Sequence, residues 1–425
     1  MNDSAVAYRT VTIAEKGESI VALSASQAVR LQEMRFCRVL PTSDEGIWRV
    51  TDVSRVGVVG LDGLRLIIQP KTPLRSLIFM ASYGGSQIAV DNHAFTFEAD
   101  SDLPTALAAS LLHAIGLATR RGLLKGYVAA AETSTVVRGR WDVSRQLKIR
   151  PGIPSPVELT LDDYTEDVPE NRILRAALSA LSRRERLPER LLKELSAALV
   201  MFGDVSDLRV NGPLTMPPLS RLNAHYQPAL RLARWVIEAT SWARQAGTTA
   251  GSAFLMNMAH VFENFVGTVL RESLASDGFD VELQASGWNL DVDGRVRMRP
   301  DIVISRRGQV ITVGDTKYKV WGPGSGSPPN ADVYQALAYA VTARVPEAHL
   351  LYVSGDVEPQ RYLIAATGTT VVAHAISLDG TPEELVERVQ EVSAELLGTR
   401  GTGSGMIAAD AGRSRRSRGT SVRTV

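Results

Sequence analysis

The sequence predicts three parts: an α+β N-terminal domain, a helical connector and a C-terminal α/β domain. Strand-type runs separated by turns come first, apolar residues at helical spacing follow, and strands then alternate with helices. The chain has 425 residues, which suffices for two or three domains of ~150 residues each. We expect the domains at 1–160, 161–250 and 251–397, and a disordered basic tail at 398–425.

The N-terminal domain begins with short β-type runs bounded by turn residues such as Asp62-Gly63. These runs lie at 47–53, 55–60 and 64–69. They predict a small antiparallel β region. Apolar residues at helical spacing then indicate helices at 73–83 and 103–124, after which 136–143 returns to strand character. The domain is therefore expected to combine both kinds of element.

The connector is predicted to contain three helices. Apolar residues share one helical face over 173–181 and again over 191–199, and Pro188 stands where the second of these helices would start. A third helix is expected over 228–244, after a Pro-rich loop.

The C-terminal domain is predicted from a hairpin and two helices. The β-type runs 299–304 and 310–317 surround a Gly-containing turn, which indicates a hairpin. Apolar residues recur at helical spacing over 254–270, and a second helix is expected from Asp332, after a flexible Gly- and Pro-rich loop at 322–329.

Composition excludes several classes of protein. A net charge of +1 gives no overall basicity, so any contact with nucleic acid has to come from local clusters. The single cysteine, Cys37, excludes an internal disulfide and a cysteine-based zinc site. The most apolar stretch, 103–124, is interrupted by Pro104 and Arg120-Arg121, and the N-terminus lacks a secretion signal. We therefore expect a cytoplasmic protein with no membrane segment.

The predicted hairpin carries charged residues on one face. Asp315 and Lys317 are two residues apart in one strand, so their side chains leave the same face. A turn centred near Arg307 would place Asp301 opposite about Val313. Asp301 would then be diagonal to Asp315, at ~7–8 Å between Cα atoms, a separation that one divalent cation can bridge.

Two carboxylates and a lysine on one sheet face suit phosphodiester hydrolysis. The carboxylates can hold Mg²⁺, which polarises the phosphate and lowers the pKa of a bound water, while the ammonium stabilises the developing negative charge. The alternative is a surface hairpin with an ordinary Asp/Lys pair.

Residues on the two flanking helices extend this hypothesis. Glu263 lies at the edge of the apolar stripe of the first helix, where it either joins the metal site or is a solvated flank residue. Gln335 and Tyr339 are one turn apart on the second helix and can reach DNA or Lys317, although Tyr339 also suits a core. His260 precedes Glu263 by three residues, and a partly buried structural histidine is the favoured interpretation.

Pro300-Asp301 and Asp315-Thr316-Lys317 resemble the PD-(D/E)xK motif of restriction-endonuclease-like nucleases, and Gln335 to Tyr339 resembles the QxxxY element of their RecB-like branch. With further segments, these motifs are similar to the McrC family, the nuclease subunit of the McrBC modification-dependent restriction system. The further segments are Gln69-Pro70-Lys71, Asp162 to Asp167, Pro169 to Leu174, Val261 to Val266 and Asp332 to Gln335. The resemblance spans about residues 50 to 355.

This resemblance implies that the C-terminal domain has the α/β restriction-endonuclease-like PD-(D/E)xK fold and cleaves DNA with Mg²⁺, or alternatively Mn²⁺. It implies that Asp301 and Asp315 are metal ligands and that Glu263 is an additional acidic ligand. Lys317 would be the catalytic lysine and Gln335 an accessory site residue. The implied partner is an McrB-like AAA+ GTPase ring, which acts on methylated double-stranded DNA and is stimulated by the docked N-terminal domain.

One absence fits a separate partner. The dipeptide Gly-Lys does not occur in the sequence, so the chain has no P-loop and the nucleotide must belong to another protein. Two other functions stay open. One is an autonomous RecB-like nuclease in repair or defence, and the other is a non-catalytic adaptor that stimulates a partner NTPase.

Overall fold

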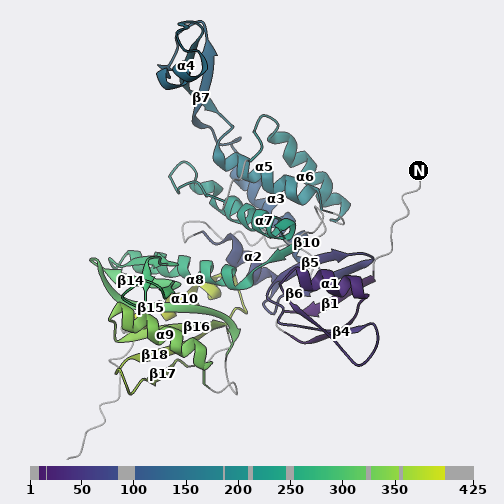
Figure 1. Ribbon diagram of the computed structural model, residues 1–425, viewed down its shortest axis with the longest axis vertical. Helices are drawn as coiled ribbons and strands as arrows, with labels where there is room; N and C mark the ends of the chain where they lie inside the picture. Colours follow the sequence, from purple (N-terminus) through teal and green to yellow (C-terminus); the bar gives the residue numbers. More distant parts are fainter. Residues whose placement is uncertain are drawn as a thin grey trace, which may run out of the picture.

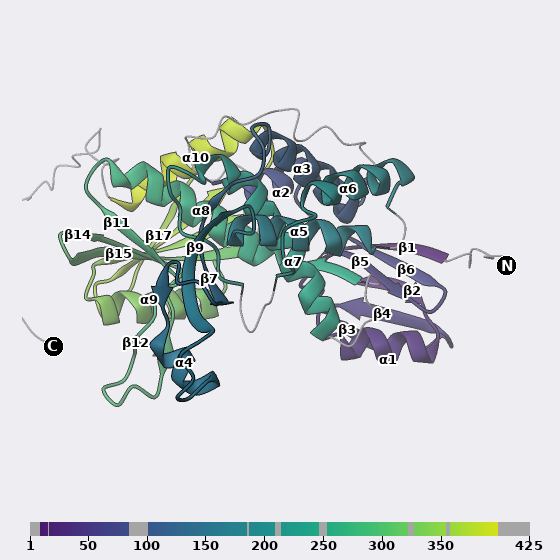
Figure 2. The same cartoon turned by 90° about the horizontal axis from the view of Figure 1, so that it is seen from above.

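The computed structural model describes residues 9–15, 17–84, 101–184, 187–208, 214–245, 253–321, 327–353 and 358–397. Figure 1 shows N-terminal sheets and a C-terminal domain side by side below a layer of helices, from which an arm projects. In Figure 2 the N-terminal sheets and the C-terminal domain again occupy opposite ends of the molecule. The predicted tail at 398–425 and most of the loop at 322–329 lie outside the described residues.

The N-terminal body contains two sheets. The larger has the strand order β1 (Arg9–Ala14), β6 (Leu64–Gln69), β5 (Val56–Leu61), β10 (Ala253–Met256). The smaller has the order β2 (Ser19–Ala22), β4 (Ile47–Thr51), β3 (Arg38–Pro41), beside helix α1 (Ala25–Glu33). A capping box at Ser24 and Gln27 satisfies backbone N–H groups at the start of α1.

Two predictions for this region are wrong. The region is not wholly antiparallel, because β1 pairs with β6 in parallel. Residues Ala253–Met256, expected at the start of a helix in the C-terminal domain, form β10 and pair with β5 of the N-terminal sheet. All four residues of β10 are buried, and periodicity does not distinguish so short an apolar run in a strand from one in a helix.

The helical layer confirms the helices expected in the connector and adds two from the N-terminal part. The helices are α2 (Leu74–Ser82), α3 (Leu103–Ala118), α5 (Pro169–Ser182), α6 (Glu189–Met201) and α7 (Gln227–Gln245), with a 3-10 turn η2 (Ala224–Tyr226) before α7. Apolar side chains of α3, α5 and α7 belong to one continuous core with the N-terminal sheets and part of the C-terminal domain. The connector is therefore packed against both of its neighbours.

The arm is a long antiparallel ladder. It consists of β7 (Gly126–Ser134), β8 (Arg140–Trp141), α4 (Val143–Ile149) and β9 (Val157–Thr165). Of the strand predicted over 136–143, only Arg140–Trp141 is paired, and β9 crosses the predicted boundary at residue 160. Few arm residues are buried, although the Glu158 carboxylate lies inside it between Arg145 and Arg150.

The C-terminal domain is a six-stranded mixed sheet with helices on both faces. Its strand order is β11 (Asp280–Leu283), β14 (Ile302–Arg306), β15 (Gln309–Val320), β16 (Glu347–Val353), β18 (Thr370–Ile376), β17 (Gln360–Leu363). The helices are α8 (Met258–Ala275) and α10 (Pro382–Leu396) on one face and α9 (Asn330–Ala343) on the other. A short ribbon of β12 (Trp288–Asn289) and β13 (Arg297–Met298) precedes β14.

The alternation of β14 explains the two faces. Ile302 and Ile304 contribute to the core shared with α8, whereas Val303 lies in the separate core under α9. This arrangement confirms a mixed α/β architecture. Among the described helices, none combines the length and the apolar character needed to cross a membrane.

Candidate active site

The hairpin of β14 and β15 brings Asp301 directly toward Asp315. Arg307 and Gly308 form a two-residue turn in which both residues have positive φ angles, of 52° and 79°. A β-bulge follows, and beyond it Ile302 pairs with Gly314. The expected pairing of Asp301 with Val313 is therefore wrong, and the carboxylates are closer neighbours than a diagonal would make them.

Asp301 is held by the strand opposite it. Its Oδ2 accepts hydrogen bonds from the Thr316 backbone N–H at 2.8 Å and from the Thr316 hydroxyl at 2.9 Å. These two bonds fix the carboxylate at the end of β14, where β14 and β15 separate.

Asp315 and Lys317 form a buried ion pair that α9 completes. The Lys317 ammonium contacts the Asp315 carboxylate and donates to Gln335 Oε1 at 2.8 Å. Gln335 Nε2 in turn donates to the Tyr339 hydroxyl at 2.7 Å, and that hydroxyl donates to the Arg299 carbonyl at 3.2 Å. The expected approach of Gln335 to Lys317 is thus present in the structure, and Tyr339 is both a site residue and a core residue.

Glu263 lies on α8, close to the two aspartates. Its carboxylate accepts a hydrogen bond from the Gln284 amide, whose oxygen accepts from Arg299. Burial, followed by the charge of Asp301, raises the pKa of Glu263 to about 7. Glu263 is partly buried and hydrogen-bonded, which favours the site interpretation over that of a solvated flank residue.

The carboxylates influence one another electrostatically. Burial and the charge of Asp301 raise the pKa of Asp315 to about 6, against the opposing effect of Lys317. Mutual destabilisation of negative charge is the condition that a bound cation relieves.

The carboxylates suit a hard cation in kind, because Mg²⁺ prefers oxygen ligands and Asp315 Oδ2 is buried. They are not assembled into a finished site. Within the described residues, no three His, Cys, Asp or Glu side chains lie close enough together to hold a metal ion as they stand. Each carboxylate instead has a partner of its own: Gln284, Thr316 or Lys317.

One site residue was not identified from the sequence. Asp332, on the first turn of α9, has a side chain that is buried beneath the two lysines of β15. Lys319 Nζ lies 3.0 Å from both of its oxygens, the Tyr352 hydroxyl donates to Oδ2 at 2.9 Å, and Lys317 Nζ is 3.8 Å from Oδ1. The spacing of Asp332 and Gln335, one helical turn, was the available signal.

His260 does not belong to this group. Its ring lies against Trp235 of α7, with 5.1 Å between ring centroids, and Nδ1 is 4.0 Å from the Glu238 carboxylate. Burial lowers its pKa. The structural interpretation of His260 is confirmed.

The loop after β6 connects the N-terminal body to β15. Thr72 and the Tyr318 hydroxyl are 2.8 Å apart, and Lys71 Nζ donates to the Tyr318 carbonyl at 3.3 Å. Tyr318 lies between Lys317 and Lys319 in β15 and is directed to the opposite face. The Gln69-Pro70-Lys71 segment therefore contacts the strand that carries the lysines.

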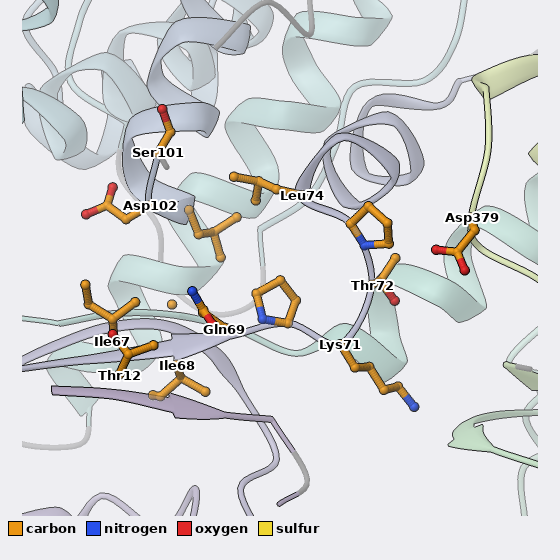
Figure 3. Close-up of a pocket in the computed structure, with 14 residues that line it drawn as sticks. Thr12, Ile67, Ile68, Gln69, Lys71, Thr72, Leu74, Ser101, Asp102 and Asp379 are labelled. Carbon is orange, nitrogen blue, oxygen red and sulfur yellow. The ribbon is translucent and has the colours of Figure 1, made fainter. Parts of the chain in front are cut away.

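A pocket of about 580 Å³ lies beside this loop but is separate from the carboxylates. Figure 3 shows Asp102 and Asp379 on opposite sides of it, and Lys71 directed away from Ser101 and Asp102. None of the five predicted site residues lines it.

Comparison with known proteins identifies a family. The family model described as McrBC 5-methylcytosine restriction system component matches residues 50–353. No curated protein matches the chain. Among solved structures, a chain of the half-complex of Thermococcus gammatolerans McrB AAA+ hexamers with bound McrC has a similar fold. Its TM-score is 0.50 at 16% identity, covering 90% of this chain and 100% of that one. A chain of the McrBC complex from the same organism has a TM-score of 0.37 at 19% identity, covering 63% and 88%.

Proposed function

This chain belongs to the family of McrBC 5-methylcytosine restriction system components, and we propose that it is the metal-dependent DNA endonuclease subunit of such a system. In this proposal the C-terminal domain has the PD-(D/E)xK fold. It cleaves methylated double-stranded DNA together with an McrB-like AAA+ GTPase ring, whose GTPase it stimulates.

One observation carries the nuclease proposal. Asp301, Asp315 and Lys317 converge where two strands separate, with Glu263 approaching from one helix and Gln335 from another. A protein that only stimulated its partner would have no need for three mutually repelling carboxylates beside a partly buried lysine.

The residues divide the chemistry between them. Glu263, Asp301 and Asp315 would hold Mg²⁺, or Mn²⁺, and this ion supplies Lewis-acid polarisation of the phosphate and a water of lowered pKa. Lys317 stabilises the negative charge that develops on the phosphate. Gln335 orients the Lys317 ammonium, and Tyr339 orients Gln335.

The arm supports the proposal of a protein partner. It projects from the helical layer (Figure 1) and exposes large apolar side chains that a monomer would be expected to bury. Among them are Tyr127, Val136, Val137, Trp141, Leu147 and Tyr164. We propose that the ring binds this arm, most of which lies within the docking region predicted at 1–160 and which ends a few residues beyond it. The solved structure with a similar fold contains McrB AAA+ hexamers with bound McrC.

The test is cleavage of a methylated plasmid in Mg²⁺ with the partner ring and GTP. We expect the Asp301→Asn and Asp315→Asn variants to cleave at least about 10²-fold more slowly than the wild type. Asp280→Asn, the same change at an exposed position of β11, is the matched control and should cleave normally.

The outcomes separate the three functions. If both variants cleave at the wild-type rate, the site assignment is wrong. A wild-type chain that stimulates the GTPase but never cleaves would be an adaptor, and one that cleaves equally well without the ring would be an autonomous nuclease.

A further inference from the structure

Asp332 is a buried acidic residue beside the proposed catalytic lysine. Its side chain enters from the first turn of α9, which packs on β15 and β16 (Figure 1), and the residue is only 4% exposed. The cost of burying a carboxylate is offset here by the Lys319 ammonium, the Tyr352 hydroxyl and the positive end of a helix. Such an arrangement keeps negative charge within reach of Lys317.

A register shift in β15 creates this arrangement. Lys317 pairs with Tyr352 of β16, but the next pair is Val320 with Val353, so two residues of β15 have no counterpart. Lys317 and Lys319 are two residues apart on one face of β15. With the register shift, both lysines and Tyr352 approach the single carboxylate of Asp332.

The Lys317 ammonium has three N–H donors and three acceptors around it. Asp315 and Gln335 accept directly, and Asp332 Oδ1 is 3.8 Å away, just beyond hydrogen-bond distance. A divalent cation on Asp315 uses the same carboxylate that Lys317 contacts. When a cation binds the Asp315 carboxylate, Asp332 is the remaining acidic side chain next to Lys317 within the described residues.

We propose that Asp332 is a positioning residue that receives the Lys317 ammonium when Asp315 binds a divalent cation. The inference rests on the proposed nuclease function and adds a residue to it. Asp332 keeps Lys317 in the site and thereby reduces the competition between the ammonium and the cation for Asp315.

The first experiment measures Mn²⁺ binding by calorimetry, with the full chain and no DNA. Without Asp332, Lys317 depends more on Asp315, so Asp332→Asn should weaken Mn²⁺ binding by about 5- to 10-fold. Lys317→Met removes the competing ammonium and should tighten binding. In the Lys317→Met background, Asp332→Asn should have no further effect.

The double variant decides between two causes. If Asp332→Asn weakens Mn²⁺ binding equally with and without Lys317, its charge acts directly on the cation and the positioning role is wrong. If Asp332→Asn leaves binding unchanged in both backgrounds, the inference also fails.

The second experiment measures cleavage with the partner ring and GTP. Asp332→Asn should lower kcat by about 10- to 100-fold with little change in KM for DNA, because Asp332 does not contact the substrate. Tyr352→Phe removes one hydrogen bond to Asp332 but keeps the carboxylate, and should lower kcat by less than about threefold. An equal loss in both variants would indicate a merely structural role and overturn the proposal.

Two further measurements test the inference. If Asp332→Asn does not fold, Lys319→Met is used in its place. The Lys319 side chain is half-exposed, and removing its ammonium leaves Lys317 as the lysine that can pair with Asp332. Mn²⁺ binding should then be at least as tight as in the wild type, and weaker binding would contradict the proposal. If the wild type cleaves normally and Asp332→Asn cleaves at the same rate, this inference alone is wrong. If the wild type does not cleave with an active ring, the nuclease function is wrong.

Discussion

The carboxylates of the candidate site repel one another. Glu263 lies on α8, Asp301 immediately precedes β14 and Asp315 lies in β15. Burial and the neighbouring charge of Asp301 raise the pKa of Glu263 to about 7 and that of Asp315 to about 6. Clustering these carboxylates is electrostatically unfavourable, and a bound cation would remove the repulsion, which supports a cation-binding role.

The raised pKa of Glu263 predicts how stability depends on pH. In the folded chain its pKa is about 7, against an ordinary value of 4.5, so the folded state binds more protons between these values. The free energy of unfolding should therefore fall as pH rises from about 4.5 to about 7. Urea unfolding in EDTA should show a shallower decline for Glu263→Gln.

Mg²⁺ provides the complementary measurement for the same variant. Mg²⁺ should raise the melting temperature of the wild type at pH 8 more than that of Glu263→Gln, because the variant offers the ion one carboxylate fewer in the folded state. Parallel pH profiles and equal Mg²⁺ shifts would show that Glu263 is outside the site.

The sequence predicts the types of residue in the site better than their contacts. The two-residue spacing of Asp315 and Lys317 places both on one strand face, and the helical turn from Gln335 to Tyr339 brings the amide to Lys317. The role of Asp332 could not be predicted, because it depends on burial and on Tyr352 from a strand 20 residues further along the chain.

Among the elements, β15 connects the parts of the molecule. One face carries Asp315, Lys317 and Lys319 toward α9, and the other carries Tyr318 toward the Lys71-Thr72 loop. The register of β15 could not be predicted from the turn alone, since the bulge near Ile304 shifts the pairing after the turn is made.

The contact between Thr72 and Tyr318 should stabilise the junction. Tyr318 is 2% exposed, and Tyr318→Phe removes only its hydroxyl and leaves the buried Thr72 hydroxyl without this partner. We expect a loss of about 1–2 kcal/mol in the free energy of unfolding, measured in urea. Tyr334→Phe, at an exposed position of α9, is the control and should change nothing. A Tyr318→Phe variant as stable as this control would contradict the structural role.

A buried histidine pair in β16 and β18 predicts a second pH effect, of opposite sign. Glu395 is 3.1 Å from His374 Nδ1, so this nitrogen donates to the carboxylate and His374 Nε2 accepts from His349 Nδ1 at 3.0 Å. Burial, followed by His374, lowers the pKa of His349 well below its ordinary value of 6.5.

The unfolded state therefore binds more protons below about pH 6.5, and stability should be lost as pH falls through that value. His349→Gln should flatten this acid limb in thermal unfolding at pH 5 to 7, whereas His225→Gln, at an exposed position, should not. An unchanged acid limb in His349→Gln would show that the pair is not responsible.

At the scale of the whole molecule, the domains are not separable units. β10 follows the connector in sequence yet completes the N-terminal sheet against β5, and the helices share one core with both neighbours. The pairing of β10 with β5 could not be predicted from the sequence, because strand partners distant in sequence leave no local pattern. Deleting residues 1–160 would remove the partner of β10.

The arm offers a cleaner deletion. Gly126 and Thr165 are paired at its base, so a short Gly-Ser turn can replace residues 127–164 without disturbing the layer below. We expect this variant to fold, to bind Mn²⁺ as the full chain does and to lose at least about 10-fold in GTPase stimulation, because the exposed apolar side chains are gone. Full stimulation by the shortened chain would place the docking surface elsewhere.

In the proposed function, one chain cuts DNA while a separate ring hydrolyses GTP. The most direct measurement records both activities in one reaction, with methylated plasmid, Mg²⁺, the ring and GTP, for the wild type and Lys317→Met. We expect the wild type to cleave only with the ring and GTP, and Lys317→Met to stimulate GTP hydrolysis equally while cleaving at least about 10²-fold more slowly. Wild-type cleavage by Lys317→Met, or equal cleavage without the ring, would contradict this account.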